Sequence, residues 1–178
     1  MVTQRVNIKI WGLIGILVIA AWLLGFVIEA QAETMKCKVA RVVTNDETMP
    51  IGDEEGHTFG MQISEGVAFF ENGEIANFKT QSISDRRTGT GKGRQSIAYI
   101  FFTFEDESSI VIKLDYRAIA DSSGNISTKA AGEMIKGTGR FQGIKGTFSS
   151  TGKMLPPIKG EADKYYIDAI LTYTLPPK

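Results

Sequence analysis

The densest run of glycine in the chain reads Lys136-Gly-Thr-Gly-Arg-Phe-Gln-Gly-Ile-Lys-Gly-Thr-Phe-Ser-Ser-Thr-Gly-Lys153. Its few apolar residues, Phe141, Ile144 and Phe148, must anchor a backbone that otherwise bends freely, because glycine reaches positive φ without strain. The pattern predicts a tight corner between two β-strands. We expect Phe141 to plug one end of a barrel and residues 147–153 to restart the sheet.

The segments around this corner have the hydrophobic patterns of β-strands. Ser109–Arg117 alternates most cleanly between apolar and charged residues. Asn72-Gly73 predicts a hairpin with a type I′ turn, and Gly66 predicts a bulge. We assign residues 45–56 and 84–94 to loops because they are rich in glycine and charge. The predicted strands are residues 35–44, 58–70, 74–84, 97–104, 109–117, 126–135, 143–153 and 165–175.

Eight short strands without a convincing amphipathic helix in the same region predict an all-β fold. A closed, eight-stranded antiparallel β-barrel leaves no bare sheet edges. Its interior is just wide enough for packed side chains or for one small apolar ligand. A sandwich of two stacked sheets is the alternative.

An apolar leader precedes the predicted barrel. Ile10–Ile28 carries no charge and follows Arg5 and Lys9, so it has the length and the flank of a membrane-spanning helix with a cytoplasmic N-terminus. Ala30-Gln31-Ala32 matches the small-x-small site of a secretory peptidase. Residues 1–32 are therefore a signal peptide, which we favour, or an N-terminal anchor in the inner membrane. In both cases residues 33–178 form an exported barrel domain, periplasmic or secreted, whose only membrane contact is through residues 10–28.

Composition excludes several classes of partner and site. The chain has 20 basic and 20 acidic residues, so nothing predicts a nucleic-acid partner. The single cysteine, Cys37, cannot form an intramolecular disulfide, and we expect a buried thiol. His57 is the only histidine, and with Cys37 it gives no metal-ligand spacing. We expect no metal and no cofactor.

Glu65 and His57 are the candidate acid–base residues. Glu65 is in phase with Phe59, Met61 and Ile63, which directs it into the barrel if Gly66 bulges after it. An inward carboxylate among apolar groups has a raised pKa. The alternative is that Glu65 lies in the bulge and faces water. His57 begins the second strand, where we expect a barrel mouth and an imidazole that exchanges protons with a ligand.

Aromatic and aliphatic side chains on the predicted strands are candidates for lining the lumen. Residues 97–104 are apolar on both faces, so either Tyr99 and Phe101 or Ile100 and Phe102 face the cavity. The other face then needs a cover, and a neighbouring subunit is a plausible one. The candidate ligand-binding residues are Tyr99, Phe101, Ile112, Tyr116 and Phe141.

Two motifs carry a resemblance to a known family. Phe104-Glu-Asp-Glu-Ser-Ser-Ile110 and Gly137-Thr-Gly-Arg-Phe-Gln-Gly-Ile-Lys-Gly146, with the eight-strand pattern over residues 35–175, resemble bacterial members of the allene oxide cyclase and dirigent barrel superfamily. The resemblance implies an eight-stranded barrel, often a trimer, that holds an apolar small molecule in its lumen. Plant cyclases of this kind close a fatty-acid epoxide, and dirigent proteins steer the coupling of phenoxy radicals. Their reactive residues have no position-by-position match here, so no catalytic role is carried over.

Three functions are compatible with the sequence. The leading hypothesis is an exported β-barrel that binds a small apolar molecule in its lumen, with weak catalysis or none. The first alternative is a cyclase or isomerase that acts on an apolar substrate. The second is a structural module whose barrel is filled by its own side chains and which forms a homo-oligomer, a trimer or a dimer.

Overall fold

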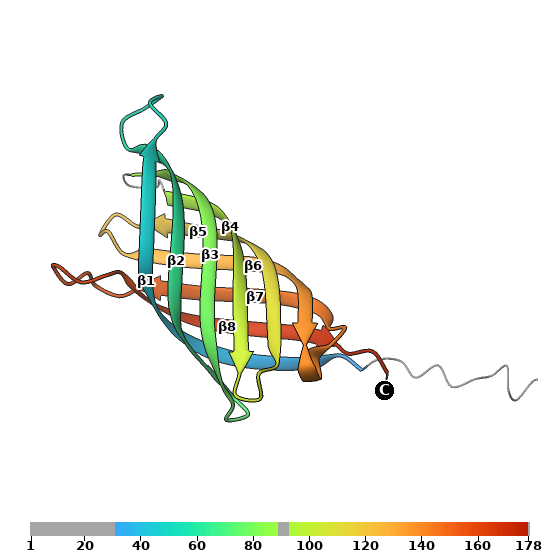
Figure 1. Ribbon diagram of the computed structural model, residues 1–178. Helices are drawn as coiled ribbons and strands as arrows, with labels where there is room; N and C mark the ends of the chain where they lie inside the picture. Colours follow the sequence, from blue (N-terminus) through green and yellow to red (C-terminus); the bar gives the residue numbers. More distant parts are fainter. Residues whose placement is uncertain (1–30, 89–92, 178) are drawn as a thin grey trace, which may run out of the picture. The chain divides into compact units, whose positions relative to one another are not determined.

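The computed structural model describes residues 31–88 and 93–177, which form a closed β-barrel (Figure 1). Each strand pairs antiparallel with the next strand in sequence, and β8 pairs with β1 to close the sheet. A single 3₁₀ turn, η1, is the one helical element of this part of the chain. The predicted all-β, eight-stranded antiparallel barrel is confirmed. The elements are β1 (Glu33–Pro50), β2 (His57–Phe70), β3 (Ile75–Arg87), β4 (Gly93–Phe104), β5 (Ser109–Ala120), β6 (Ile126–Thr138), η1 (Gly139–Phe141), β7 (Lys145–Met154) and β8 (Lys164–Thr174).

The predicted leader, with its apolar run at residues 10–28, lies outside the described residues. Its helix, its cleavage after Ala32 and the export of the barrel therefore stay predictions. Among the residues that are described, no helix has the length and apolar character needed to cross a membrane.

Strand β1 is longer than its sequence predicts. Residues 45–50, which we expected in a loop, pair with β2 from Asn45 opposite Ile63 to Pro50 opposite Thr58. Pairing with β8 stops at Val42, so this extension has a partner on one side only, and all of it is exposed. Water on both faces accounts for its loop-like composition, and Pro50 is tolerated because it lies on an open edge.

Gly66 does not form the bulge that we predicted. The pairing of β2 with β3 runs through Gly66 without a shift, and the bulge of this region lies in β1, at Thr44. Gly66 instead permits a close approach of β1, because a Cβ atom there would lie 2.0 Å from the carbonyl oxygen of Ala40. The glycine therefore allows β1 and β2 to pack closely.

The hairpin at Asn72-Gly73 is confirmed, but its turn is not type I′. Gly73 has φ +89°, whereas Asn72 is not in the positive-φ region. The Gly73 N–H donates to the carbonyl oxygen of Phe70 (3.0 Å), and the Phe70 N–H donates to that of Glu74 (2.9 Å). This pattern is a three-residue loop with one left-handed glycine, so a single residue supplies all the positive φ that the turn requires.

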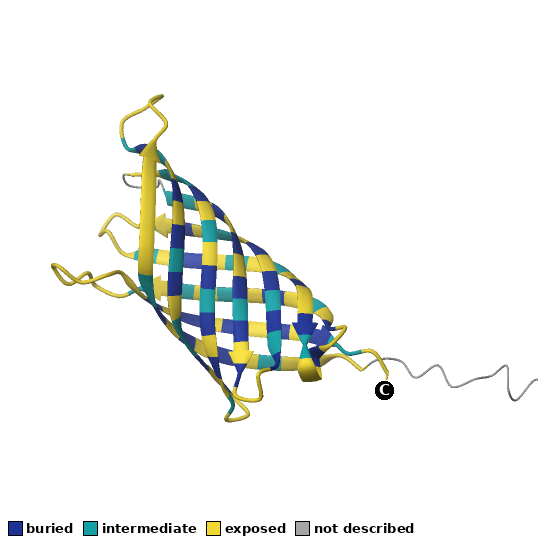
Figure 2. Cartoon of the chain, viewed as in Figure 1, coloured by how far each residue is buried: buried dark blue, intermediate teal, exposed yellow. Residues whose placement is uncertain are grey.

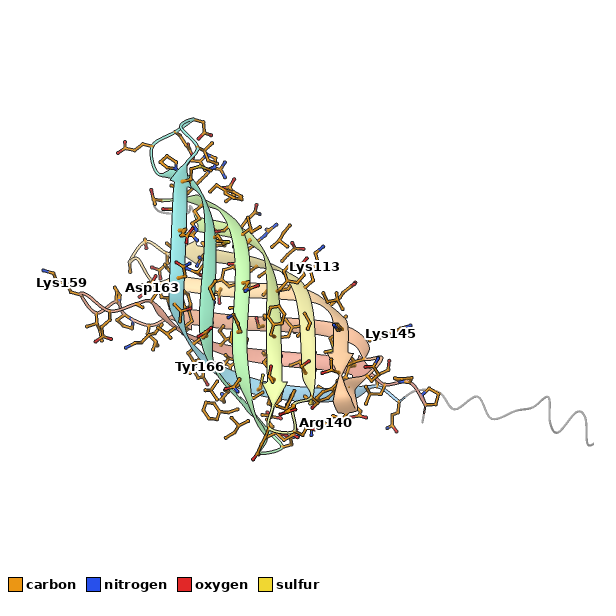
Figure 3. The ribbon with its side chains drawn as sticks, viewed as in Figure 1. Lys113, Arg140, Lys145, Lys159, Asp163 and Tyr166 are labelled. Carbon is orange, nitrogen blue, oxygen red and sulfur yellow. The ribbon has the colours of Figure 1, made fainter. Side chains whose placement is uncertain are left out.

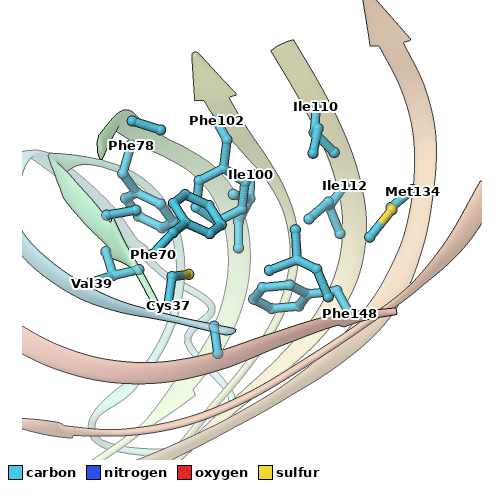
Figure 4. Close-up of a cluster of buried hydrophobic side chains, with 14 of the residues drawn as sticks. Cys37, Val39, Phe70, Phe78, Ile100, Phe102, Ile110, Ile112, Met134 and Phe148 are labelled. Carbon is cyan, nitrogen blue, oxygen red and sulfur yellow. The ribbon is translucent and has the colours of Figure 1, made fainter. Parts of the chain in front are cut away.

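Alternation along the strands divides inner from outer side chains, visible as alternating bands of buried and exposed residues in Figure 2. The inner side chains fill the lumen near the β2–β3 turn with aromatic and aliphatic groups that converge from all sides (Figure 4). The Cys37 thiol is buried there, as expected, and burial raises its pKa to about 12. Phe70 and Phe78 meet the Phe102 ring in edge-on contacts at 5.7 and 5.5 Å.

The glycine-rich corner closes this aromatic end of the barrel. η1 places Phe141 against Phe104, with ring centroids 5.0 Å apart, and Phe141 is 3% exposed. Arg140 lies over both rings and pairs with Glu74 and Asp106. The predicted plug at Phe141 and the restart of the sheet at β7 are both confirmed.

Candidate functional site

The end of the lumen opposite the aromatic plug is lined by polar side chains. They occupy inward positions on seven strands, because the alternation that buries phenylalanine at one end continues to the other. We name this set the polar end of the lumen. Its members are Arg41, Gln62, Ser64, Thr80, Ser84, Arg94, Ser96, Tyr116, Thr128 and Tyr165.

Arg41 lies across the polar end and is 8% exposed. Its Nη1 donates to Ser64 Oγ at 2.9 Å, and its guanidinium lies 4.5 Å from the ring centroid of Tyr165, the residue opposite it on β8. Its Nε has no hydrogen-bond partner among the described residues. A buried guanidinium therefore keeps one donor unused.

Arg94 brings a second guanidinium to the same place. Its Nη1 donates to Gln62 Oε1 at 2.9 Å and its Nη2 donates to Tyr165 Oη at 3.3 Å. The Arg94 guanidinium lies 5.5 Å from the centroid of the Tyr116 ring. The Arg41 guanidinium lies 5.8 Å from the same centroid. Both arginines therefore contact the same two tyrosines, Tyr116 and Tyr165.

The electrostatics of the polar end are cationic. Burial lowers the pKa of Arg41, and the neighbouring Arg94 lowers it further. Arginine nevertheless stays protonated in proteins. Burial also raises the pKa of Tyr165, which keeps its hydroxyl neutral. Within the described residues neither arginine forms an ion pair with a carboxylate.

A small cavity lies beneath Arg41 and Tyr116. Its volume is about 30 Å³, which is room for about one water molecule. Phe78, Leu114 and Phe148 form part of its apolar wall. The lumen is therefore almost filled by its own side chains.

The structure places the predicted ligand-binding residues on both sides of the wall. Tyr99 and Phe101 point out of the barrel, so their expected place in the lumen is wrong, and the alternative pair, Ile100 and Phe102, faces inward. The register of β4 decides this, since one step along a strand changes the face.

Ile112, Tyr116 and Phe141 do face the lumen. Ile112 and Phe141 belong to its filled part and do not line the small cavity, so a ligand contact at either residue stays a prediction. Tyr116 lines the cavity, and its buried hydroxyl meets no partner of the described chain in good hydrogen-bond geometry, although it lies close enough to Arg41 to raise the pKa of that guanidinium against the larger effect of burial.

Glu65 lies on the outer surface, which overturns its predicted inward orientation. Its carboxylate accepts a hydrogen bond from Lys79 Nζ at 3.0 Å, and its side chain is 52% exposed. The face that it shares with Phe59, Met61 and Ile63 is the outer face of β2. The phase of Glu65 with these apolar residues is therefore correct, but the apolar face that it shares lies outside the lumen.

His57 begins β2 and is buried, but its ring is held by two carboxylates. Nδ1 lies 2.6 Å from Asp53 Oδ1 and Nε2 lies 3.2 Å from Asp85 Oδ2. Both ring nitrogens are therefore engaged with protein groups, and proton exchange with a ligand at His57 stays a prediction. Hydrogen bonding to Asp85, with Asp53 as a second partner, raises the pKa of His57 against the effect of burial and of Arg87.

We expect the stability of the barrel to fall as pH rises above about 6.5. A histidine whose pKa is raised in the folded state stabilises the fold fully below its unfolded pKa of 6.5 and loses that contribution as pH rises through the folded pKa. Urea unfolding at pH 5.5, 6.5, 7.5 and 8.5 measures this, with His57→Gln as the comparison. A free energy of unfolding with the same pH profile in both proteins would contradict the assignment, since the chain has one histidine.

Sequence reasoning missed Arg41, Gln62 and Arg94. In sequence, Arg41 resembles one more of the water-facing charges of this strand, such as Lys36 and Lys38, although it is in phase with the inward Cys37 and Val39. This phase is the sequence signal that places Arg41 inside the barrel. Arg94 was hidden in a glycine-rich segment with no alternation to place it. In the described residues no group of three or more potential ligands is arranged to hold a metal ion.

A second hollow lies on the outer surface of β2–β5. It is an open groove of about 940 Å³, and its apolar wall includes Phe59, Met61, Ile83, Ile97 and Tyr99. Ile83 and Ile97 are each 53% exposed. Lys113, which points away from the barrel in Figure 3, lies at the groove with Asp85, Asp115 and Arg117.

Comparison with known proteins adds the following. No family model matches the chain, and no curated protein matches it. Among solved structures, the pterocarpan synthase dirigent protein GePTS1 is 15% identical, with a TM-score of 0.47, over 86% of this chain and 96% of that one. The pterocarpan synthase dirigent protein PsPTS1 is 12% identical, with a TM-score of 0.41, over 83% and 97% of the two chains. Similarity at this level says nothing about ligand or activity.

Proposed function

We propose that this chain is an exported barrel that binds a small apolar molecule at the polar end of its lumen. One observation carries the proposal: Arg41 Nε, Ser96 Oγ and Tyr116 Oη are buried there without partners among the described residues. Buried polar atoms are rarely left unpaired in folded proteins. A ligand fits this site if its polar group hydrogen-bonds to these atoms and its apolar part packs on Leu114 and Phe148.

The ligand must displace a side chain to bind. The cavity of about 30 Å³ admits no organic molecule as it stands. Arg41 closes it from above, and arginine has several rotatable bonds and a charged head that water solvates well. The Arg41 side chain therefore shifts to admit the apolar part of the ligand and still donates to its polar group, while the aromatic plug at the opposite end stays in place.

Filling the cavity should abolish binding. Ala130 lines the cavity, and Ala130→Phe puts an aromatic ring where the ligand would lie. We expect native mass spectrometry of the wild-type chain from its own host to show a bound apolar mass, and the Ala130→Phe protein to show none. The neighbouring Ala131 is exposed on the outer face, so Ala131→Phe is the matched control and should keep the bound mass.

Two results would end this proposal. One is a wild-type protein that carries no additional mass under native conditions. The other is a mass that Ala130→Phe retains, which would place the ligand outside the lumen.

The cyclase or isomerase alternative gains no support from the positions of its predicted acid–base residues. Glu65 is exposed to solvent beside Lys79, and His57 is held between Asp53 and Asp85. Catalysis in the lumen would need another acid or base.

The outer groove on β2–β5 supports a second function, assembly into a homo-oligomer. Large exposed apolar areas on soluble proteins mark contact surfaces. We propose a second copy of this chain as the occupant, because the groove carries both signs of charge beside its apolar wall: Lys113 and Arg117 with Asp85 and Asp115. A two-fold contact brings each sign against the other. The native mass spectra that report bound ligand also report the number of subunits, and a monomer at micromolar concentration would overturn this assembly.

A further inference from the structure

We infer that the arginine pair Arg41 and Arg94 is a binding site for an oxyanion, and that the polar group of the ligand is a carboxylate or a phosphate. The inference rests on the proposed function, since it names the head group for the same end of the lumen. Three features of the site support it: the positive charge of the two arginines, the unpaired hydrogen-bond donors, and the partial exposure of Arg94 to solvent.

No carboxylate of the described residues forms an ion pair with Arg41 or Arg94, although Asp163 is near enough to help burial raise the pKa of Tyr165. The nearest acidic group in the hydrogen-bond network is Asp46, which accepts from Gln62 Nε2 at 3.3 Å and pairs with Arg86 at 2.7 Å. Asp46 therefore already serves another arginine. Two guanidinium groups beside the same tyrosines repel each other, and a buried charge is retained only where something compensates it. An anion between them supplies that compensation.

The unused hydrogen bonds at the site all come from groups that donate. Arg41 Nε can only donate, and the Ser96 and Tyr116 hydroxyls each carry a proton. Ser96 and Tyr116 are directly opposite each other on β4 and β5, with both side chains turned inward. Arg41 and Tyr165 are likewise opposite on β1 and β8. The site thus presents donors from several strands at the same end of the lumen, and Arg41 and Tyr116 both line the small cavity there.

A ligand that only accepts hydrogen bonds and carries negative charge fits this arrangement. Guanidinium groups bind carboxylate and phosphate with paired, charge-assisted hydrogen bonds. A cation would be repelled by both arginines, and a neutral amide would leave their charge uncompensated. Arg94 is only half-buried, whereas Arg41 is covered, so the anion meets Arg94 first and then reaches Arg41.

The experiment compares three probes with the purified full chain: benzoate, benzamide and inorganic phosphate. Benzoate and benzamide have nearly the same shape and differ in charge. Titration is followed by calorimetry and by the Nε–H signal of Arg41 in ¹⁵N spectra, which needs no variant protein. We expect benzoate to shift that signal and to bind at least about tenfold more tightly than benzamide.

Three variants locate the site. Arg94→Gln and Arg41→Gln should each weaken benzoate binding by about tenfold or more, the loss expected for a charge-assisted hydrogen bond. Lys129→Gln removes the same charge from the outer face of β6 and should leave binding unchanged. Far-UV circular dichroism shows whether each variant is folded, and Arg94→Gln keeps the test open if Arg41→Gln is not.

Each outcome has one meaning. Equal binding of benzoate and benzamide overturns the oxyanion site but supports the proposed function. Binding of phosphate without either aromatic probe supports an oxyanion site for a free anion and overturns the apolar-ligand proposal. Binding of none of the three overturns both. Benzoate binding that is unaffected at Arg41 and Arg94 also overturns the arginine site.

Discussion

Replacement of Phe102 by alanine is expected to lower the free energy of unfolding by about 3–5 kcal/mol, the range for deleting a buried phenylalanine. Phe102 is fully buried, and its ring contacts those of Phe78 on the adjacent strand and Phe70 on the next strand along. These neighbours belong to β2 and β3, and strands locked into a closed sheet cannot collapse into the cavity that Phe102→Ala leaves. Urea unfolding followed by far-UV circular dichroism measures the loss.

The adjacent residue is the matched control. Phe101 has the same side chain but lies on the outer face of β4 and is partly exposed. Phe101→Ala should therefore cost less than about 1.5 kcal/mol, because little packing is lost at a half-exposed site. Equal losses at the two positions would show that the inner and outer faces of β4 are assigned incorrectly.

The barrel itself could be predicted because most of its strands show a clear alternation of apolar and polar residues. Ser109–Arg117 has the cleanest alternation in the chain, broken only at Val111, and the structure extends the strand to Ala120. The glycine-rich corner could be placed because glycine has a physical reason to occupy a tight turn: Gly139 and Gly143 both have positive φ. Local sequence was sufficient to predict the structure at positions where a residue type, such as glycine, has one strong backbone preference.

The face of β4 could not be predicted, because its two faces are equally apolar. Residues 97–104 place large apolar groups on both sides, one in the lumen and one along the outer groove. Periodicity locates a buried face only when the other face is polar. The same ambiguity misplaced Glu65, since the outer face of β2 is also apolar.

The candidate site was missed because its parts become neighbours only when the barrel closes. Arg41 and Tyr165 are opposite each other through the pairing of β1 with β8, the first and last strands. Arg94 reaches Gln62 from β4, two strands away from β2 in the sheet. No local spacing in the sequence encodes either contact. The long β1 was likewise hidden, because its solvated end has the composition of a loop.

Replacement of Gly66 by alanine is expected to destabilise the barrel by about 3 kcal/mol, at the upper end of overpacking costs. A Cβ atom at this position would lie 2.0 Å from the carbonyl oxygen of Ala40 and 2.7 Å from the Cα of Arg41. Both atoms belong to the backbone of β1, so the strand itself would have to move. Because Arg41 belongs to that segment, Gly66→Ala should also weaken ligand binding at the polar end, which the benzoate titration measures.

Gly60, on the same strand, separates backbone collision from the general effect of adding a methyl group. Its nearest neighbours would be the guanidinium atoms of Arg86, at 2.7 Å or more. This guanidinium pairs with Asp46, but a flexible side chain shifts with its partner far more easily than a strand backbone does. Alanine also restricts the unfolded chain, which stabilises the fold by about 0.4–1 kcal/mol where the native backbone permits it. Gly60→Ala should therefore leave the free energy of unfolding nearly unchanged. If both variants behave alike, the close approach of β1 to β2 is not what requires glycine at position 66.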